Sequence, residues 1–193
     1  MDTQSWKETK ELIKSDLQRF NTNSKLKLIK YLINNASFKI TFWFRIGSFL
    51  QQKTGIIFKL LYIITKLIYK HNQYLTGIQL PLGTKIKGGL NFSHFSCIVL
   101  NKNCIIGSNC TIFQGVTIGS VRGPKGGVPI IGNNVVICAG AKIIGKVNIG
   151  SNVIIGAGAV VVNNIPDNSV AVGVPAQVIS KNGILNTEYY LIN

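Results

Sequence analysis

The chain has 193 residues, which suffices for one main domain with a small appended module but not for two full domains. Hydrophobic residues make up 46% of it, too many for a disordered chain, and 5 prolines beside 20 glycines exclude a proline-rich fibre. The net charge of +15 favours polyanionic partners, whether nucleic acid, acidic lipid surfaces or phosphorylated small molecules.

Residues 1–75 show helical periodicity and carry 13 basic and 4 acidic side chains. Their apolar residues predict three or four helices, with breaks at Asn34-Asn35 and Thr54-Gly55. Lysines alternate with aromatic residues, but no nucleic-acid recognition signature accompanies them. We therefore predict helix packing with a basic outer face and no nucleic-acid partner. Peripheral contact with an anionic membrane is an alternative that ranks below helix packing.

The N-terminus is polar and has no apolar stretch before a small-residue cleavage site. The most apolar segment, residues 56–69, has 14 residues and is interrupted by Lys59 and Lys66, whereas a membrane-spanning helix needs about 20 apolar residues. We therefore expect a cytoplasmic protein, with attachment to the inner face of the membrane left open.

From Leu82 onward, apolar residues recur every six positions. Eleven of the thirteen positions in this row are Leu, Ile or Val, and the position four residues later is small or apolar. Two inward positions in every six residues indicate a parallel β-helix built from hexapeptides, with glycine, serine and asparagine at its turns. The row consists of Leu82, Gly88, His94, Leu100, Ile106, Ile112, Ile118, Ile131, Ile137, Ile143, Ile149, Ile155 and Val161.

The cysteines fit this scheme without a metal. Cys97, Cys104, Cys110 and Cys138 show no paired spacing of the kind that zinc or redox sites have. Cys104 and Cys110 fall in the second inward row, so we predict that they fill the core. The predicted organisation is a mainly β chain with an N-terminal helical region over 1–75, a β-helix over 76–180 and a C-terminal tail over 181–193.

The repeat is interrupted once. Ile118 and Ile131 are thirteen residues apart, one period plus seven residues, and the stretch between them is rich in glycine and proline. We predict an extruded loop over 119–130. Loops that leave a rigid scaffold tend to carry binding or catalysis.

The runs NFSHFSCIVLNKNCIIGSNCTIFQGVTIG and VVICAGAKIIGKVNIGSNVIIGAGAVV, with the terminal AVGVPAQVI, resemble the serine acetyltransferase branch of the hexapeptide-repeat acyltransferases. The resemblance covers roughly residues 76–180 and implies that the β-helix is left-handed. It also implies acetyl transfer from acetyl-CoA to a hydroxyl group without a metal, and a homotrimer or a dimer of trimers. The histidine that acts as general base in the family corresponds to His94, and the aspartate that orients it corresponds to Gln79.

His94 is conspicuous on the residues alone, because its row otherwise holds mostly Leu, Ile or Val. A lone histidine in such a row is more often a satisfied structural group, but the resemblance of the flanking residues favours catalysis. An imidazole with a pKa of about 7 can take the proton of an alcohol as its oxygen attacks a thioester. Backbone N–H groups near Gly119-Ser120 are candidate donors to the oxyanion.

The chain departs from the family where an amino acid would bind. Serine-specific members have two aspartates and an Arg-His pair at positions where this chain has Gln79, Ser93, Gly127 and Val128. A free amino acid carries two opposite charges, so the loss of the matching charges favours a neutral acceptor, such as a sugar of a surface polysaccharide or its precursor. Serine O-acetylation for cysteine biosynthesis and a non-catalytic scaffold or binding protein are the alternatives.

The resemblance assigns further residues by position. The pantetheine arm of acetyl-CoA is expected beside small residues that leave the backbone accessible, and its phosphates beside basic side chains. Candidates for acetyl-CoA binding are Ser120, Ala139, Ala157, Lys142 and Lys181, with Arg122 and Lys125 as comparable basic residues on the loop. Candidates for acceptor binding are Ser93, Val128 and Arg122.

Two rival classes share the β-helix. A metal-dependent enzyme of the γ-carbonic-anhydrase type needs three histidine ligands, whereas the chain has 2 histidines. An ice-binding or scaffold protein would need a flat threonine array or a repeat without the loop.

Overall fold

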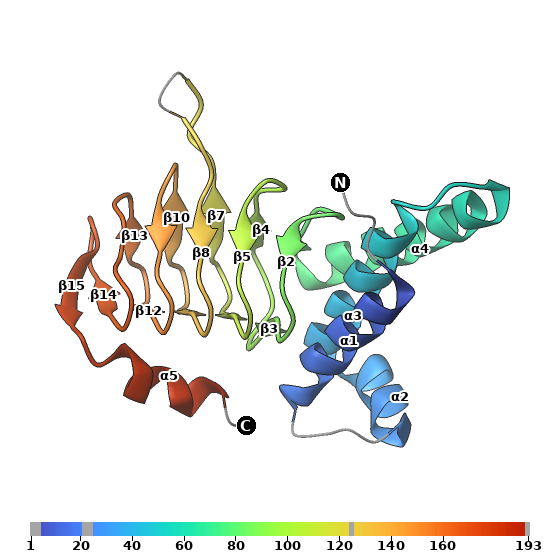
Figure 1. Ribbon diagram of the computed structural model, residues 1–193, viewed down its shortest axis with the longest axis horizontal. Coiled ribbons are helices and arrows are strands. Elements are labelled where there is room, and N and C mark those ends of the chain that lie inside the picture. Colours follow the sequence, from blue (N-terminus) through green and yellow to red (C-terminus); the bar gives the residue numbers. More distant parts are fainter. Residues whose placement is uncertain (1–4, 21–24, 124–125, 192–193) are drawn as a thin grey trace.

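The computed structural model describes residues 5–20, 25–123 and 126–191. Helices at one end are followed by stacked coils of short strands, which we call the tower, and a C-terminal helix runs beside the tower (Figure 1). The helices are α1 (Trp6–Gln18), α2 (Lys25–Asn34), α3 (Ala36–Leu50), α4 (Ile56–Thr76) and α5 (Gly183–Leu191). Asn35 caps α3 and Gly55 precedes α4, at the two places where breaks are predicted. No helix within the described ranges has the length and hydropathy needed to cross a bilayer.

The strands form three sheets, and the chain passes from one sheet to the next at each corner of a coil. Sheet A has the order β1-β4-β7-β10-β13, sheet B the order β11-β8-β5-β2, and sheet C the order β15-β14-β12-β9-β6-β3. Pairing is parallel except between β14 and β15. The strands are β1 (Ile78–Gln79), β2 (Lys85–Ile86), β3 (Asn91–Phe92), β4 (Ile98–Leu100), β5 (Ile105–Ile106), β6 (Thr111–Ile112), β7 (Thr117–Gly119), β8 (Ile130–Ile131), β9 (Val136–Ile137), β10 (Lys142–Ile144), β11 (Asn148–Ile149), β12 (Ile154–Ile155), β13 (Val160–Val161), β14 (Val170–Val172) and β15 (Gln177–Ser180).

A regular coil contains three hexapeptides. Val99 pairs with Thr117, 18 residues further on, and Lys142 pairs with Val160 at the same interval. The predicted inward rows are buried from Leu100 onward and form one continuous core. The prediction of a left-handed parallel β-helix behind an N-terminal helical region is confirmed.

Cys104 and Cys110 belong to this core, as predicted. Burial raises the pKa of Cys104 to about 11 and the pKa of Cys110 to about 12, so both thiols are protonated at neutral pH. Neither cysteine has the properties of a nucleophile.

The coil that contains His94 is longer than a regular coil. Ile78 pairs with Ile98, 20 residues further on. Five residues separate the buried Phe92 from the buried Ile98, whereas three separate Ile112 from Val116 in the next coil. The two additional residues therefore lie in the corner that carries His94.

This longer corner corrects the start of the predicted inward row. The two extra residues change which positions face the core, so Leu80 and Ile86 are buried before the corner. Leu82 and Gly88 are half-buried, and His94 is exposed. The prediction that these three positions continue the row was wrong, because a constant period assumes corners of constant length.

The second irregular coil carries the loop. Ile118 pairs with Ile143, 25 residues further on, which is seven more than in a regular coil. The excess leaves the tower after β7 as a hairpin, in which Val121 and Gly127 exchange backbone hydrogen bonds of 3.2 and 3.1 Å (Figure 1).

Asparagines stack at the corners between sheets B and C. Asn109, Asn134, Asn152 and Asn168 have φ values of 57°, 54°, 56° and 57°. Asparagine tolerates this left-handed conformation better than other non-glycine residues. Each side chain donates from Nδ2 to Oδ1 of the next, over 3.1, 2.9 and 3.0 Å. The ladder therefore links four successive coils.

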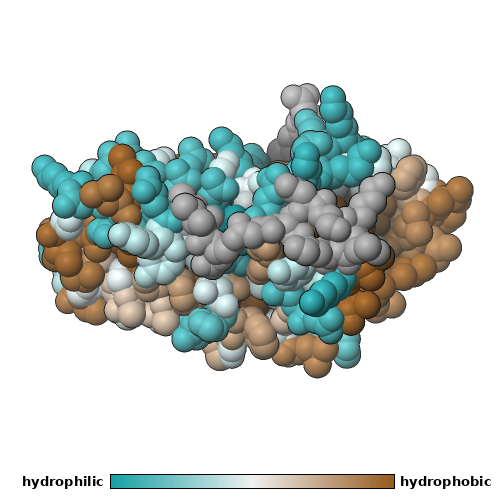
Figure 2. Space-filling view, turned by 90° about the horizontal axis from the view of Figure 1, so that it is seen from below, coloured by the Kyte–Doolittle hydropathy of each residue, from teal (hydrophilic) through white to brown (hydrophobic). Residues whose placement is uncertain are grey.

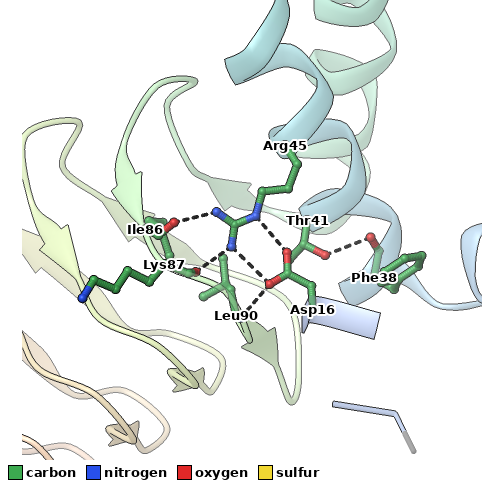
Figure 3. A network of polar contacts seen from close by, with 7 residues as sticks. All are labelled: Asp16, Phe38, Thr41, Arg45, Ile86, Lys87 and Leu90. Carbon is green, nitrogen blue, oxygen red and sulfur yellow. Dashed lines mark hydrogen bonds and ion pairs between the residues drawn. The ribbon is translucent and has the colours of Figure 1, made fainter. Parts of the chain in front are cut away.

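A buried ion pair joins the helices to the first coil (Figure 3). Arg45 of α3 donates from Nε to Asp16 Oδ2 at 2.9 Å and from Nη2 to Asp16 Oδ1 at 3.1 Å. The guanidinium also donates to the carbonyls of Ile86 and Lys87, at 2.7 and 2.8 Å. Asp16 Oδ1 accepts a further hydrogen bond from Leu90 N at 2.9 Å. Helices α1 and α3 and the β-helix thus share one polar network.

The C-terminal segment, expected as a tail, contains helix α5. It packs beside β12 and is tied to the end of α1 by Arg19, whose Nη2 donates to Tyr190 O and to Thr111 Oγ1, each at 2.7 Å. The chain end therefore returns along the tower toward the helical region (Figure 1).

Asp16→Ala is expected to lower the free energy of unfolding by about 3–5 kcal/mol, because it leaves the buried Arg45 guanidinium without its carboxylate. Urea unfolding followed by circular dichroism measures the change. Glu11→Ala on the exposed face of the same helix is the matched control, with an expected change within about 0.5 kcal/mol. Equal losses in the two variants would contradict the importance of the ion pair.

Asn134→Ala is expected to destabilise the β-helix more than Asn134→Gly. Both variants lose the side-chain ladder, but alanine also pays about 1–2 kcal/mol for the left-handed conformation. Thermal unfolding compares the two, with the exposed Asn163→Ala as a control outside the ladder. An alanine variant at least as stable as the glycine variant would refute this account.

Candidate active site

The corners that lead from sheet C to sheet A stack along one edge of the tower, which we call the His94 edge: residues 93–97, 113–115, 138–140 and 156–158. Gly115 N donates to Ser96 O at 2.9 Å, and Gly158 N donates to Ala139 O at 2.8 Å. Ala139 is half-buried and Ala157 is exposed. The later corners carry small side chains, so their backbone is accessible from outside.

His94 occupies the longest corner of this edge. Its ring centroid lies 5.9 Å from that of Phe113, which in turn lies 6.0 Å from the ring of Tyr190 in α5. Within the residues that the structure describes, neither imidazole nitrogen has a hydrogen-bond partner. The exposed ring therefore rests against an aromatic neighbour while its nitrogens are free to bind a substrate hydroxyl.

Ser93, beside His94, opens onto a hollow of about 280 Å³ between the helical region and the first coil. The hollow combines asparagine side chains with aromatic walls. Its lining includes Phe20, Asn34, Asn35, Asn91, Ser93 and Phe95. His94 itself is not among the residues that line the hollow.

Gln79 is exposed on β1, in register with Val99 of β4. No hydrogen bond joins Gln79 to His94 in the described part of the chain. No contact within the single chain thus supports the role predicted for Gln79, which is to orient the His94 ring.

The loop residues lie at the next edge, where the chain leaves sheet A. Ser120 Oγ accepts a hydrogen bond from Asn101 Nδ2 at 3.1 Å. Arg122 is exposed on the hairpin and Val128 is half-buried near its base, while Lys125 lies outside the described residues. A strand of sheet A separates Ser120 from the His94 edge, so one chain does not gather all the predicted site residues at one corner.

Lys142 differs from a free surface lysine. Its Nζ donates to Gly115 O and, at 3.1 Å, to Thr117 Oγ1, so the ammonium is held beside the His94 edge. Lys181 is exposed after β15, near the C-terminal end of the tower. The two candidate phosphate contacts therefore lie in different places, and Lys142 is the one next to the edge.

Phe113 and Tyr190 were missed by reasoning from the sequence. Phe113 could have been noticed from the sequence, because it is a large aromatic residue, whereas the equivalent corner positions in the next two coils hold the smaller Cys138 and Gly156. Nothing in the sequence pointed to Tyr190, since only the folding of α5 along the tower brings it to Phe113.

Comparison with known proteins agrees with this architecture. Residues 129–163 match the model of the bacterial transferase hexapeptide (six repeats). The serine acetyltransferase of Staphylococcus xylosus is 40% identical over 123 residues, which cover 63% of this chain and 57% of that protein. The serine acetyltransferase of Staphylococcus aureus strain N315 is 40% identical over 124 residues, covering 64% and 58%. The chain thus spans less than two thirds of the length of these relatives.

Solved structures extend the likeness to the helical region. The serine acetyltransferase of Neisseria gonorrhoeae in complex with serine is 27% identical, with a TM-score of 0.72, over 89% of this chain and 69% of that chain. The soybean serine acetyltransferase apoenzyme is 25% identical, with a TM-score of 0.73, over 90% of this chain and 69% of that chain.

The fold and the repeats define a hexapeptide-repeat protein with a left-handed parallel β-helix. Within that class the chain is similar to serine acetyltransferases: the similarity in sequence covers the β-helix, and the similarity in structure also covers the helices.

Proposed function

We propose that this protein is an acetyl-CoA-dependent O-acetyltransferase in which His94 is the general base. The observation that carries the proposal is an exposed imidazole with unoccupied nitrogens, in an enlarged corner at the end of an edge of accessible backbone. The similarity to serine acetyltransferases over the same segment supports it.

The chemistry requires a base and an acetyl donor. Acetyl-CoA supplies the acetyl group as a thioester. His94 removes the proton of the acceptor hydroxyl as its oxygen attacks the carbonyl carbon, and the protonated imidazole then returns a proton to the departing sulfur. Phe113 supports one side of the ring and restricts its orientation. A base positioned in this way contributes about 10²–10⁴-fold to the rate.

The residues of the His94 edge fit a coenzyme A arm. A long, thin pantetheine chain can lie only where side chains are small, and Ala139 and Ala157 with Gly140 and Gly158 meet that condition. Lys142 would supply a positive charge beside the same strip. Ser120 and the loop residues would meet the His94 edge of a neighbouring copy, which favours a homotrimer or a dimer of trimers with shared sites.

The charges of the chain favour a neutral acceptor. No acidic residue occurs anywhere from position 17 to position 166, so neither this segment nor the same segment of a neighbouring copy can pair with the ammonium group of an amino acid. Gln79, Ser93 and Val128 offer uncharged contacts instead. We therefore propose a sugar hydroxyl of a surface polysaccharide or its precursor as the acceptor.

L-Serine is the second candidate acceptor, and a specific observation favours it: the curated relatives named above are serine acetyltransferases. Release of coenzyme A thiol from acetyl-CoA, measured with L-serine and with a panel of sugars and nucleotide sugars, separates the two. Turnover with serine alone would overturn the neutral acceptor, and no transfer to any hydroxyl would overturn the enzymatic proposal.

His94→Asn is expected to lower kcat by about 10²–10⁴-fold on whichever acceptor the wild type uses, because asparagine cannot accept the proton. His71→Asn, which replaces the other of the 2 histidines at an exposed position on α4, is expected to leave kcat unchanged. Circular dichroism verifies that both variants fold. Full turnover by the His94 variant would refute its role as base.

A further inference from the structure

Helix α4 packs against the protein with its polar side. Its buried residues are Thr65, Tyr69, Asn72 and Thr76. Tyr69 OH donates to Leu80 O at 2.6 Å, while Asn72 Nδ2 and Thr76 Oγ1 donate to carbonyls within α4, each at 2.8 Å. The polar groups of the helix are thus satisfied on the inner side, which is the reverse of an ordinary surface helix.

The outer side of α4 is apolar. In the single chain, Ile56 is 81% exposed and Ile57 is 70% exposed. Figure 2 shows hydrophobic side chains gathered at the right-hand end of the molecule, where α4 lies in Figure 1. Phe58 is 39% exposed, and the more exposed apolar residues of the helix, which we call the α4 face, are Ile56, Ile57, Leu60, Leu61, Ile63, Ile64, Leu67, Tyr74 and Leu75. Contiguous apolar surface of this kind marks an interaction site.

A row of lysines borders the α4 face. Lys59, Lys66 and Lys70 are separated by seven and four residues, so they lie along one side of the helix, and all three are exposed. Helix α4 has no acidic residue, and neither has any position from 17 to 166. The helix thus combines an apolar stripe with uncompensated positive charge along its border.

We propose that α4 binds an anionic lipid bilayer, lying in the plane of the surface with the α4 face in the boundary between headgroups and acyl chains. In this orientation the lysine stems follow the apolar surface and their ammonium groups reach the lipid phosphates. Anionic lipids supply the negative charge that this part of the chain lacks. The proposal is independent of the acetyltransferase activity.

Charge complementarity selects the bilayer over a second copy of the chain. If two copies joined through their α4 faces, each row of Lys59, Lys66 and Lys70 would approach another positive row, and no acidic residue between positions 17 and 166 could compensate either. A bilayer that contains phosphatidylglycerol buries the same apolar side chains and neutralises the lysines.

Co-sedimentation of the full chain with vesicles tests the proposal. The wild type is expected to sediment with vesicles of phosphatidylcholine and phosphatidylglycerol, to remain in the supernatant with phosphatidylcholine alone, and to bind less as salt is raised. The triple variant Lys59→Gln, Lys66→Gln, Lys70→Gln is expected to lower the partition coefficient about 100-fold. Lys7→Gln, Lys10→Gln, Lys14→Gln removes the same charge from exposed positions on α1 and is expected to have a smaller effect.

A second pair of variants tests the apolar contact. Leu60→Ser with Leu67→Ser removes two residues that are 60% and 67% exposed and is expected to abolish vesicle binding. Ile179→Ser with Leu185→Ser changes two residues of similar exposure, 64% and 62%, outside α4 and is expected to bind like the wild type. Equal binding by the two double variants, or no binding of the wild type to anionic vesicles, would overturn the proposal.

Analytical ultracentrifugation without lipid provides the remaining readout. Under the proposal, Leu60→Ser with Leu67→Ser leaves the oligomeric state of the wild type unchanged. A drop to half the wild-type mass would show that the α4 face joins two copies of the assembly, and would overturn the lipid proposal in favour of a protein interface.

Discussion

The β-helix depends on hydrogen bonds between successive coils. Its strands are mostly two or three residues long. A single coil of such strands cannot bury its apolar side chains by itself, and its strands do not pair with one another. Thr111 N therefore donates to Val135 O in the next coil, and Val136 N donates to Val153 O in the coil after that, each at 2.9 Å. Every coil must keep its strands in register with those of the previous coil, whereas the interval between paired residues varies from 16 to 25 residues.

This requirement explains why the irregular segments occur at corners. An additional residue within a strand would turn inward side chains outward in all later coils, whereas an additional residue at a corner can bulge into solvent. The two-residue excess of the first coil moves His94 outward, and the seven-residue excess produces the hairpin after β7. Both predicted functional segments are thus corners that contain more residues than the corners of a regular coil.

The helical region solves a different problem at the start of the tower. The first coil has no preceding coil, so its backbone groups need partners from elsewhere. Arg45 and Asp16 provide them through the carbonyls of Ile86 and Lys87 and the N–H of Leu90. Helix α4 packs with its polar side against the protein, and its apolar side is exposed in the single chain.

The residue pattern by itself determined the β-helix, the inward rows from Leu100 onward and the seven-residue excess before Ile131, because spacing along the chain reports these features directly. Only the tertiary structure decided that His94 is exposed, that α4 turns its apolar side outward, and that Tyr190 reaches Phe113. These features depend on the length of one corner and on contacts between distant segments. A local period carries no information about either.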